Sequence, residues 1–278
     1  ELGSVYEKLR GYIRFAQNIR SSISYHQMLA WARAVIILRG EDADEQVFGM
    51  LLSAQDHLAA LQAMAASETL PLPLANYHTA MAMCEYLMGN FEKSFRHACE
   101  ADPLMISVLG LPEWPEQKIW LVLSATTCLT EGMALDRTWQ TARKKALAMI
   151  AKWATACPAN YAAKYHLVLC EDHLLNGRRP EAILEAERSI RAAAESGMSY
   201  IGALAAERLA RIHALQNEPE KHAAQLRYAL LEYDRWGARA KVDRLLQQHP
   251  ALASGSSEIS GSNPSMSSGS LDLKSILQ

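Results

Sequence analysis

The chain has 278 residues, half of which are hydrophobic, and carries a formal net charge of -2 at neutral pH. This near-neutral charge argues against nucleic-acid binding, which requires clustered lysine and arginine to neutralise phosphates. No apolar run approaches the roughly 18 residues that a membrane span needs, and no run of alternating β-branched residues predicts a sheet. We therefore expect an all-α protein that does not enter a membrane.

Cysteine usage indicates a reducing compartment. The chain has five cysteines, an odd number, and none of them forms a Cys-x-x-Cys pair. Single cysteines scattered through alanine- and leucine-rich stretches are typical of reduced, buried thiols in a cytoplasmic protein. The first residues, Glu1-Leu2-Gly3-Ser4, form neither a signal peptide nor an initiator methionine, so we expect a piece of a longer protein.

The N-terminal quarter of the chain predicts three helical segments, at residues 4–21, 24–38 and 48–64. One stripe of the first segment is apolar and should be buried. It contains Val5, Leu9, Tyr12, Ile13 and Ala16. Gly40 ends the second segment, and Asp42 and Asp44 suit the N-terminus of the third. The helical pattern then breaks at Pro71-Leu72-Pro73.

The rest of the sequence predicts alternating helices and corners. The helices lie at residues 74–88, 91–101, 116–130, 135–156, 160–175, 180–196, 199–215, 218–235 and 238–248. Pro103, Pro112 and Pro115 leave room for at most one short helix between residues 101 and 116. In segment 135–156 the apolar residues keep a spacing of three and four, which predicts a heavily buried helix. They are Trp139, Ala142, Ala146, Met149, Ile150 and Trp153.

Turn residues recur at a nearly constant interval. The positions are Gly40, Gly89, Gly132, Gly177 and Asn217, at steps of 49, 43, 45 and 40 residues. Repeats of this length are typical of stacked helical hairpins, each of which packs on its neighbours to bury its apolar face. The sequence therefore predicts an α-solenoid, a right-handed superhelix of about five hairpins, with an extended groove along its concave side.

Composition divides the chain into three parts. Residues 1–250 form the predicted helical-repeat domain. Residues 251–270 contain nine serines and three glycines, which predicts a disordered linker, because such a segment cannot offset the entropy lost on ordering. Residues 271–278 have the apolar spacing of a helix start, and we expect them to lead into a missing downstream domain.

Two corners resemble the tetratricopeptide repeat. In residues 89–98 (GNFEKSFRHA) and 177–186 (GRRPEAILEA), a small residue follows the corner glycine after five positions and another after nine. Small residues at these positions let the two helices of a hairpin approach. The hairpin from Leu215 to Tyr233 matches less closely, with Asn217 in place of the glycine. The resemblance implies a tetratricopeptide-like fold that binds rather than catalyses.

A second resemblance covers residues 161–278. The segments YHL (165–167), GRRPEA (177–182), AAERLA (205–210), YDRWGARAKV (233–242) and LDL (271–273) occur in this order. They look like the helical-repeat region of very large hybrid histidine kinases of bacteria and fungi, in which a kinase-like domain and a P-loop ATPase module precede the repeats and a GAF domain follows. This chain has no GxxxxGK[ST] loop and no kinase signature, so the resemblance brings no catalytic activity with it.

The concave groove is the predicted binding surface. If the tetratricopeptide pattern holds, the first helix of each hairpin lines this side and presents a mixture of polar and apolar residues. The candidate groove residues are Asn76, Thr79, Met83, Tyr86, Lys164, Leu167, Glu171, Leu204, Glu207 and Arg211. Such a mixture suits a peptide or a partner helix, and the alternative is that these are ordinary solvent-facing side chains.

The sequence offers weak candidates for chemistry. His166, Cys170 and His173 share a helix face with metal-like spacing, but they also occupy inward-facing core positions, and we favour a packed core. No G-x-S-x-G elbow is present. The basic cluster at residues 143–145 is interpreted as the solvated face of a helix. We therefore expect no metal site, no cofactor and no enzymatic activity.

These observations favour a non-catalytic interaction and sensing module that couples an ATPase module to downstream GAF and kinase domains through its groove. The expected partner is a protein or peptide, a class that includes the neighbouring domains of the same polypeptide. One alternative is a helical repeat that binds a small-molecule inducer, which would require a deep apolar pocket in the concave face. Another is a structural spacer that self-associates, as a homodimer, through the first two hairpins.

Overall fold

A computed structural model of the chain describes residues 1–41, 53–67 and 71–254, and every regular element within these ranges is helical. The helices are α1 (Leu2–Asn18), α2 (Ser22–Arg39), α3 (Ala54–Ser67), α4 (Leu72–Leu87), α5 (Phe91–Ala101), the 3-10 helix η1 (Asp102–Val108), α6 (Glu113–Thr130), α7 (Arg137–Ala156), α8 (Pro158–Leu175), α9 (Arg179–Ser196), α10 (Ser199–Leu215), α11 (Pro219–Trp236), α12 (Arg239–Gln248) and α13 (Ala251–Ser254). The predicted all-α class is confirmed.

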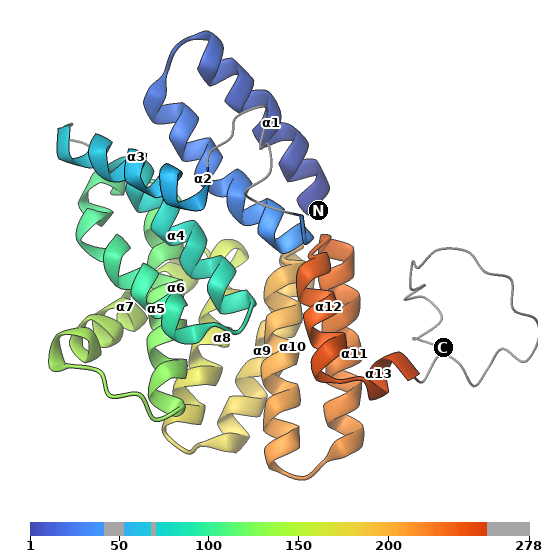
Figure 1. Ribbon diagram of the computed structural model, residues 1–278. Helices are drawn as coiled ribbons and strands as arrows, with labels where there is room; N and C mark the ends of the chain where they lie inside the picture. The colour runs from blue at the N-terminus through green and yellow to red at the C-terminus, as the bar shows by residue number, and fades with distance from the viewer. Residues whose placement is uncertain (42–52, 68–70, 255–278) are drawn as a thin grey trace, which may run out of the picture.

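Five helical hairpins follow one another along the chain, as the sequence predicts. The pairs are α1–α2, α4–α5, α6–α7, α8–α9 and α10–α11. The first hairpin contacts the second through α2 and α4, and from there on the first helices of successive hairpins touch, which builds a curved stack (Figure 1). Four described elements stand outside the hairpins: α3, η1, α12 and α13. Of these, α3 packs on α4, and α12 follows the last hairpin and returns to α2.

Four of the five predicted turn positions close a hairpin. Gly89, Gly132 and Gly177 have φ angles of 74°, 89° and 72°, and Asn217 has a φ of 59°. This left-handed conformation costs little for glycine and is tolerated by asparagine, which explains the residue types. Gly40 differs, because it ends α2 and so separates two hairpins, while the corner between α1 and α2 lies at Arg20.

The prolines before α4 and those after α5 affect the helices differently. Pro71 and Pro73 lie at the start of α4, where a missing backbone N–H leaves no hydrogen bond unmade. They therefore begin a helix rather than an irregular break. Pro103 lies in η1, the one short helix expected between residues 101 and 116.

The C-terminal helices close the stack onto the N-terminal hairpin. A methyl group added at Gly237 would lie 3.6 Å from the Leu2 side chain, and one added at Gly40 would lie 3.5 Å from the Ala240 backbone. The α4–α5 corner also touches α12. A methyl group added at Gly89 would lie 3.4 Å from the Arg244 guanidinium. The two ends of the solenoid thus meet.

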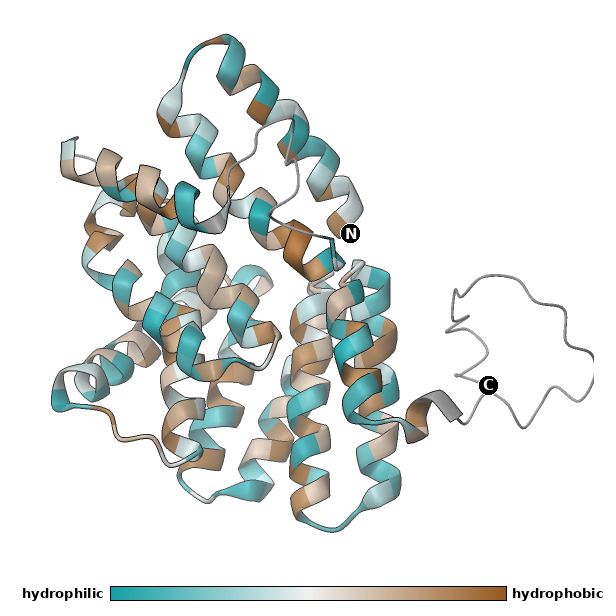
Figure 2. Cartoon of the chain, in the orientation of Figure 1, coloured by the Kyte–Doolittle hydropathy of each residue, from teal (hydrophilic) through white to brown (hydrophobic). Residues whose placement is uncertain are grey.

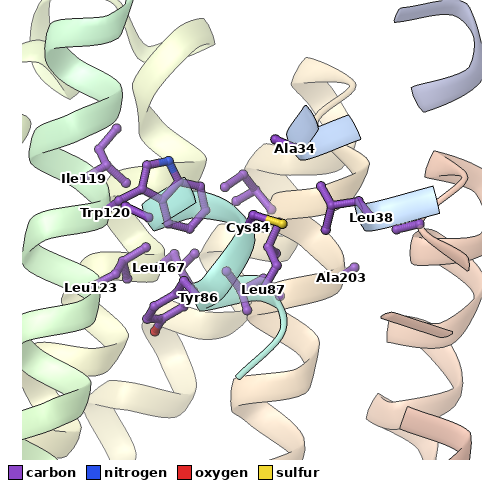
Figure 3. Packing of buried hydrophobic residues seen from close by; sticks show 14 of the residues in the cluster. Ala34, Leu38, Cys84, Tyr86, Leu87, Ile119, Trp120, Leu123, Leu167 and Ala203 are labelled. Atoms are coloured by element: carbon purple, nitrogen blue, oxygen red, sulfur yellow. The ribbon is translucent and has the colours of Figure 1, made fainter. Parts of the chain in front are cut away.

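The C-terminal half of α4 fills the space inside the curve (Figure 3). Tyr86 and Leu87 lie between Leu123 of α6, Leu167 of α8 and Ala203 of α10. One apolar cluster consequently runs from Leu2 to Leu252. The expected open groove along the concave side is therefore wrong, because the first helices pack around α4 and bury the area they were expected to expose.

Two further expectations need correction. The apolar face of segment 135–156 is only partly covered, since Trp139, Met149 and Trp153 are half-buried, whereas Ile150 is buried. Helical structure also continues past residue 250, because α13 takes the first four residues of the predicted linker and buries Leu252. The predicted linker at 255–270, the helix start at 271–278, and Asp42, Asp44 and residues 48–52 of the third segment lie outside the described residues.

Candidate functional site

The ten candidate groove residues gather at the inner side of the stack, but they do not line an open surface. Seven of them are buried: Asn76, Thr79, Tyr86, Lys164, Leu167, Glu171 and Leu204. Met83, Glu207 and Arg211 are half-buried. The filling of the interior by α4 makes most of these positions part of the core.

Three of the candidates belong to a chain of polar contacts across the interior. The Tyr86 hydroxyl of α4 hydrogen-bonds the Thr127 hydroxyl of α6, with 2.9 Å between the oxygens. Thr127 in turn donates to Glu171 of α8, over 3.2 Å. The Arg208 guanidinium of α10 lies 3.2 Å from the other Glu171 oxygen, so Glu171 forms an ion pair with its charge fully buried. Four first helices are linked by this chain.

Arg208 also contacts aromatic rings of the second hairpin. Its guanidinium carbon lies 4.6 Å from the centre of the Phe91 ring and 5.0 Å from that of Tyr86. A cation over a ring face is attracted by the ring quadrupole, and the attraction is larger when both groups are desolvated. Burial raises the pKa of the Tyr86 hydroxyl, which therefore stays protonated.

A second group of polar residues continues the chain to α12. The Lys241 ammonium lies 2.9 Å from Glu207, and the Tyr233 hydroxyl donates to the other Glu207 oxygen over 3.1 Å. Burial would raise the pKa of Glu207, but the positive charges of Lys241 and Arg208 outweigh it and lower that pKa. Glu207 is therefore ionised at neutral pH.

We call these seven residues the central network. They are Tyr86, Thr127, Glu171, Glu207, Arg208, Tyr233 and Lys241. The network contains two carboxylates and two basic side chains, so its net charge is zero. Every carboxylate oxygen in it lies near a proton donor or a cation, which makes the arrangement suited to holding helices together rather than to transferring protons.

The remaining candidates have local structural partners. Asn76 accepts a hydrogen bond from the Trp31 indole over 2.9 Å, and Thr79 donates to the Ala75 carbonyl. Lys164 forms an ion pair with Glu116. Arg211, at the rim, lies 3.5 Å from Glu131. Each of these four polar candidates therefore has a partner within the chain.

One member of the basic cluster at 143–145 is not solvated. Arg143 is buried, and its guanidinium binds Asp172 over 2.7 Å and the Thr126 hydroxyl over 3.2 Å. The interpretation of this residue as part of a solvated face is therefore wrong, whereas Lys144 and Lys145 are exposed. The local sequence does not indicate which of these three basic residues is buried, because the partner of Arg143, Asp172, belongs to another hairpin.

The metal-like spacing on α8 assembles no metal centre in the residues that the structure describes. The His166 Nδ1 atom lies 2.6 Å from a Glu185 oxygen of α9. Cys170 is buried in a small apolar cluster, and burial raises the pKa of its thiol well above the ordinary value. Cys170 is therefore a packed core residue, as expected, whereas His166 and His173 are half-buried and do not belong to the core.

An exposed apolar surface lies on α1, at the edge of the molecule (Figure 1). Val5, Tyr12, Phe15 and Ile19 are 42%, 60%, 61% and 55% exposed, and Figure 2 shows apolar residues along this helix. We call these four residues the α1 stripe. Val5 and Tyr12 were expected to be buried with Leu9, but a neighbouring face of α1 packs on α2 instead. The spacing of residues 5, 12 and 19 by seven positions was the signal in the sequence that these side chains share one face.

Comparison with known proteins leaves the chain without a match. No protein-family model matches it, and no curated protein or solved structure does. Among the described helices, none combines the length and apolar character that crossing a bilayer requires.

Proposed function

We propose that this chain is a non-catalytic protein-interaction module that binds a partner helix on the α1 stripe. The single observation that carries the proposal is the exposure of four large apolar side chains, three on α1 and Ile19 directly after its end. Terminal repeats of a solenoid normally carry a polar outer face, because nothing else covers them. An apolar outer face at this position is typical of an interaction site.

The spacing of the α1 stripe indicates the shape of the partner. Val5, Tyr12 and Ile19 repeat every seven residues, so the stripe runs along the helix axis and suits an elongated occupant. An amphipathic helix with apolar residues at positions i, i+3 or i+4 and i+7 has this form. The charged residues of α1 are Glu7, Lys8, Arg10 and Arg14, which favours acidic residues at the edges of the partner helix.

The resemblance to hybrid histidine kinases supports a neighbouring domain of the same polypeptide as the source of this helix. In this proposal the closed stack is a rigid connector between an ATPase module and GAF and kinase domains. The proposed compartment is the cytoplasm, which the five free thiols support. A homodimer through the first two hairpins is the alternative, because Val5 and Ile19 are evenly spaced about Tyr12, which suits antiparallel pairing of two copies of α1.

A photo-crosslinking amino acid in place of Phe15, in the full-length polypeptide, tests the proposal. We expect one dominant crosslink to a peptide with helical apolar spacing. The matched control is the same substitution at Leu215, which is 57% exposed at the end of α10 and should not give that product. Crosslinks spread over many peptides would contradict the proposal, and a crosslink to α1 of a second copy would establish the homodimer instead.

A further inference from the structure

A hollow of about 580 Å³ lies along α7, away from both the α1 stripe and the central network. Its walls are Asp102 of η1 and Lys118 of α6 on one side and the α7 face from Arg137 to Met149 on the other. This volume falls within the range of about 300–1,000 Å³ that is typical of small-molecule sites.

The hollow lies between two aromatic contacts that α7 makes with its neighbours. Near the start of α7, Trp139 packs edge-on against Phe95 of α5, with 5.9 Å between ring centres. Near its end, Trp153 packs against Trp114 of α6 at 5.4 Å. Between these contacts α7 presents small side chains, so its apolar face is not filled from the opposite wall. The small side chains are Ala142 and Ala146.

The apolar residues of the lining are less exposed than its basic residues Arg137 and Lys145. Ala142, Ala146 and Met149 provide apolar surface. Lys118 is paired with Asp102, the one acidic residue of the lining, over 2.5 Å. Arg137 and Lys145 form no ion pair within the described part of the chain, and α7 has five basic residues and no acidic one. Arg137 and Lys145 lie about 12 Å apart along the axis of α7, and each offers the hollow a positive charge without an ion-pair partner.

From this geometry we propose that the hollow binds a small amphiphile with an apolar body and one anionic head group, a carboxylate or a phosphate monoester. The apolar body lies on the alanines and Met149, between the two aromatic contacts. The head group lies at Arg137 and Lys145, with the hydroxyls of Thr138 and Thr141 within the same lining. This proposal does not depend on the α1 stripe, which lies on a different helix.

Calorimetric titration of the whole chain at about 0.15 M salt tests the proposal, a concentration at which weak surface attraction is screened. The probes are octanoate, octyl phosphate and neutral octan-1-ol. We expect both anions to bind one site and octan-1-ol to bind about tenfold more weakly or not at all, because it lacks the charge that Arg137 and Lys145 recognise. Equal binding of octan-1-ol and octanoate, or no binding of either anion up to millimolar concentration, would overturn the proposal.

Two matched pairs of variants locate the site. Lys145→Met should weaken octanoate binding about tenfold, whereas Lys144→Met, which removes an exposed charge outside the lining, should change it less than about twofold. Ala142→Leu should narrow the hollow and weaken binding, whereas Ala148→Leu on the exposed side of α7 should not. Equal effects within either pair would mean that the anions bind elsewhere. Circular dichroism of each variant verifies folding, and Arg137→Gln replaces any variant that fails to fold.

Discussion

The guanidinium of Arg208 lies over the ring of Tyr86, with 5.0 Å between its carbon and the ring centre. Tyr86 belongs to the second hairpin and Arg208 to the fifth, so this contact crosses the space that a solenoid usually leaves open. The same arginine lies 3.2 Å from Glu171 of the fourth hairpin. Arg208 is therefore the residue through which hairpins distant in the sequence are joined inside the curve.

Removal of Arg208 should destabilise the fold strongly. Arg208→Met leaves the Glu171 carboxylate buried without its counter-charge, and we expect a loss of about 3–5 kcal/mol in the free energy of unfolding by urea. The double variant Glu171→Gln, Arg208→Met should recover part of this loss, because the unpaired charge is gone. Arg211→Met, one turn further along α10 at the exposed rim, is the control and should cost less than about 1 kcal/mol. Equal losses at both arginines would contradict the assigned role.

Acidification should destabilise the packing of α3 through buried histidines. His57 of α3 stacks on His26 of α2, with 5.5 Å between ring centres, and meets Tyr77 of α4 edge-on. Burial, with the charges of Arg33 and His26, lowers the pKa of His57 to about 3. Burial, with the charge of a neighbouring histidine, lowers the pKa of His78 to about 4.

The direction of the pH effect follows from these lowered values. Histidines of the unfolded chain titrate near pH 6.5, so below that pH the unfolded state binds protons that the folded state excludes. The free energy of unfolding therefore keeps the full contribution of these neutral histidines above about pH 6.5 and decreases as the pH falls towards 4. Urea unfolding should show a loss on the order of 2–4 kcal/mol between pH 7 and pH 5. His57→Phe should reduce this loss, and an unchanged pH dependence in His57→Phe would refute the assignment.

Two glycines should respond in opposite ways to alanine. Gly11 lies inside α1, and no atom lies within 4 Å of the methyl group that alanine would add, so Gly11→Ala should raise stability by about 0.5–1 kcal/mol. Gly177 also has open space, but its φ of 72° is left-handed, so Gly177→Ala should cost about 1–2 kcal/mol. Thermal unfolding of both variants measures the difference. A neutral Gly177→Ala would show that this corner is not left-handed.

Thiol reactivity should be confined to one position. Burial raises the pKa of Cys84 and Cys99 to about 12 and that of Cys128 to about 11. At pH 8 their thiolate fraction is lower than that of an ordinary thiol by a factor of about 100–1,000. Cys157, half-buried between α7 and α8, should therefore react first with a disulfide reagent. Cys157→Ser should remove the fast phase, and a fast phase that persists would contradict this assignment.

The helices and most corners could be predicted from the chain because both depend on neighbours in sequence. The segments 91–101 and 199–215 have the predicted ends, since α5 and α10 are defined by local apolar spacing and by turn residues beside them. Gly89 and Gly177 mark corners for the same reason, as left-handed backbone is a property of one residue. Tyr86 and Glu171, two of the residues predicted for the groove, instead contact Thr127 of α6.

Whether the inner face of the helix stack is open or filled depends on the curvature of the stack. Side-chain contacts between residues far apart in sequence determine this curvature. The contacts of Leu2 with Gly237 and of Gly40 with Ala240 join the two ends of the stack, and no local pattern announces them. The same limit explains Arg143 and Lys145, which look alike in the sequence. One is buried against Asp172 and the other lines a hollow, because the shape of the neighbouring hairpin determines which charge meets a partner and which meets solvent.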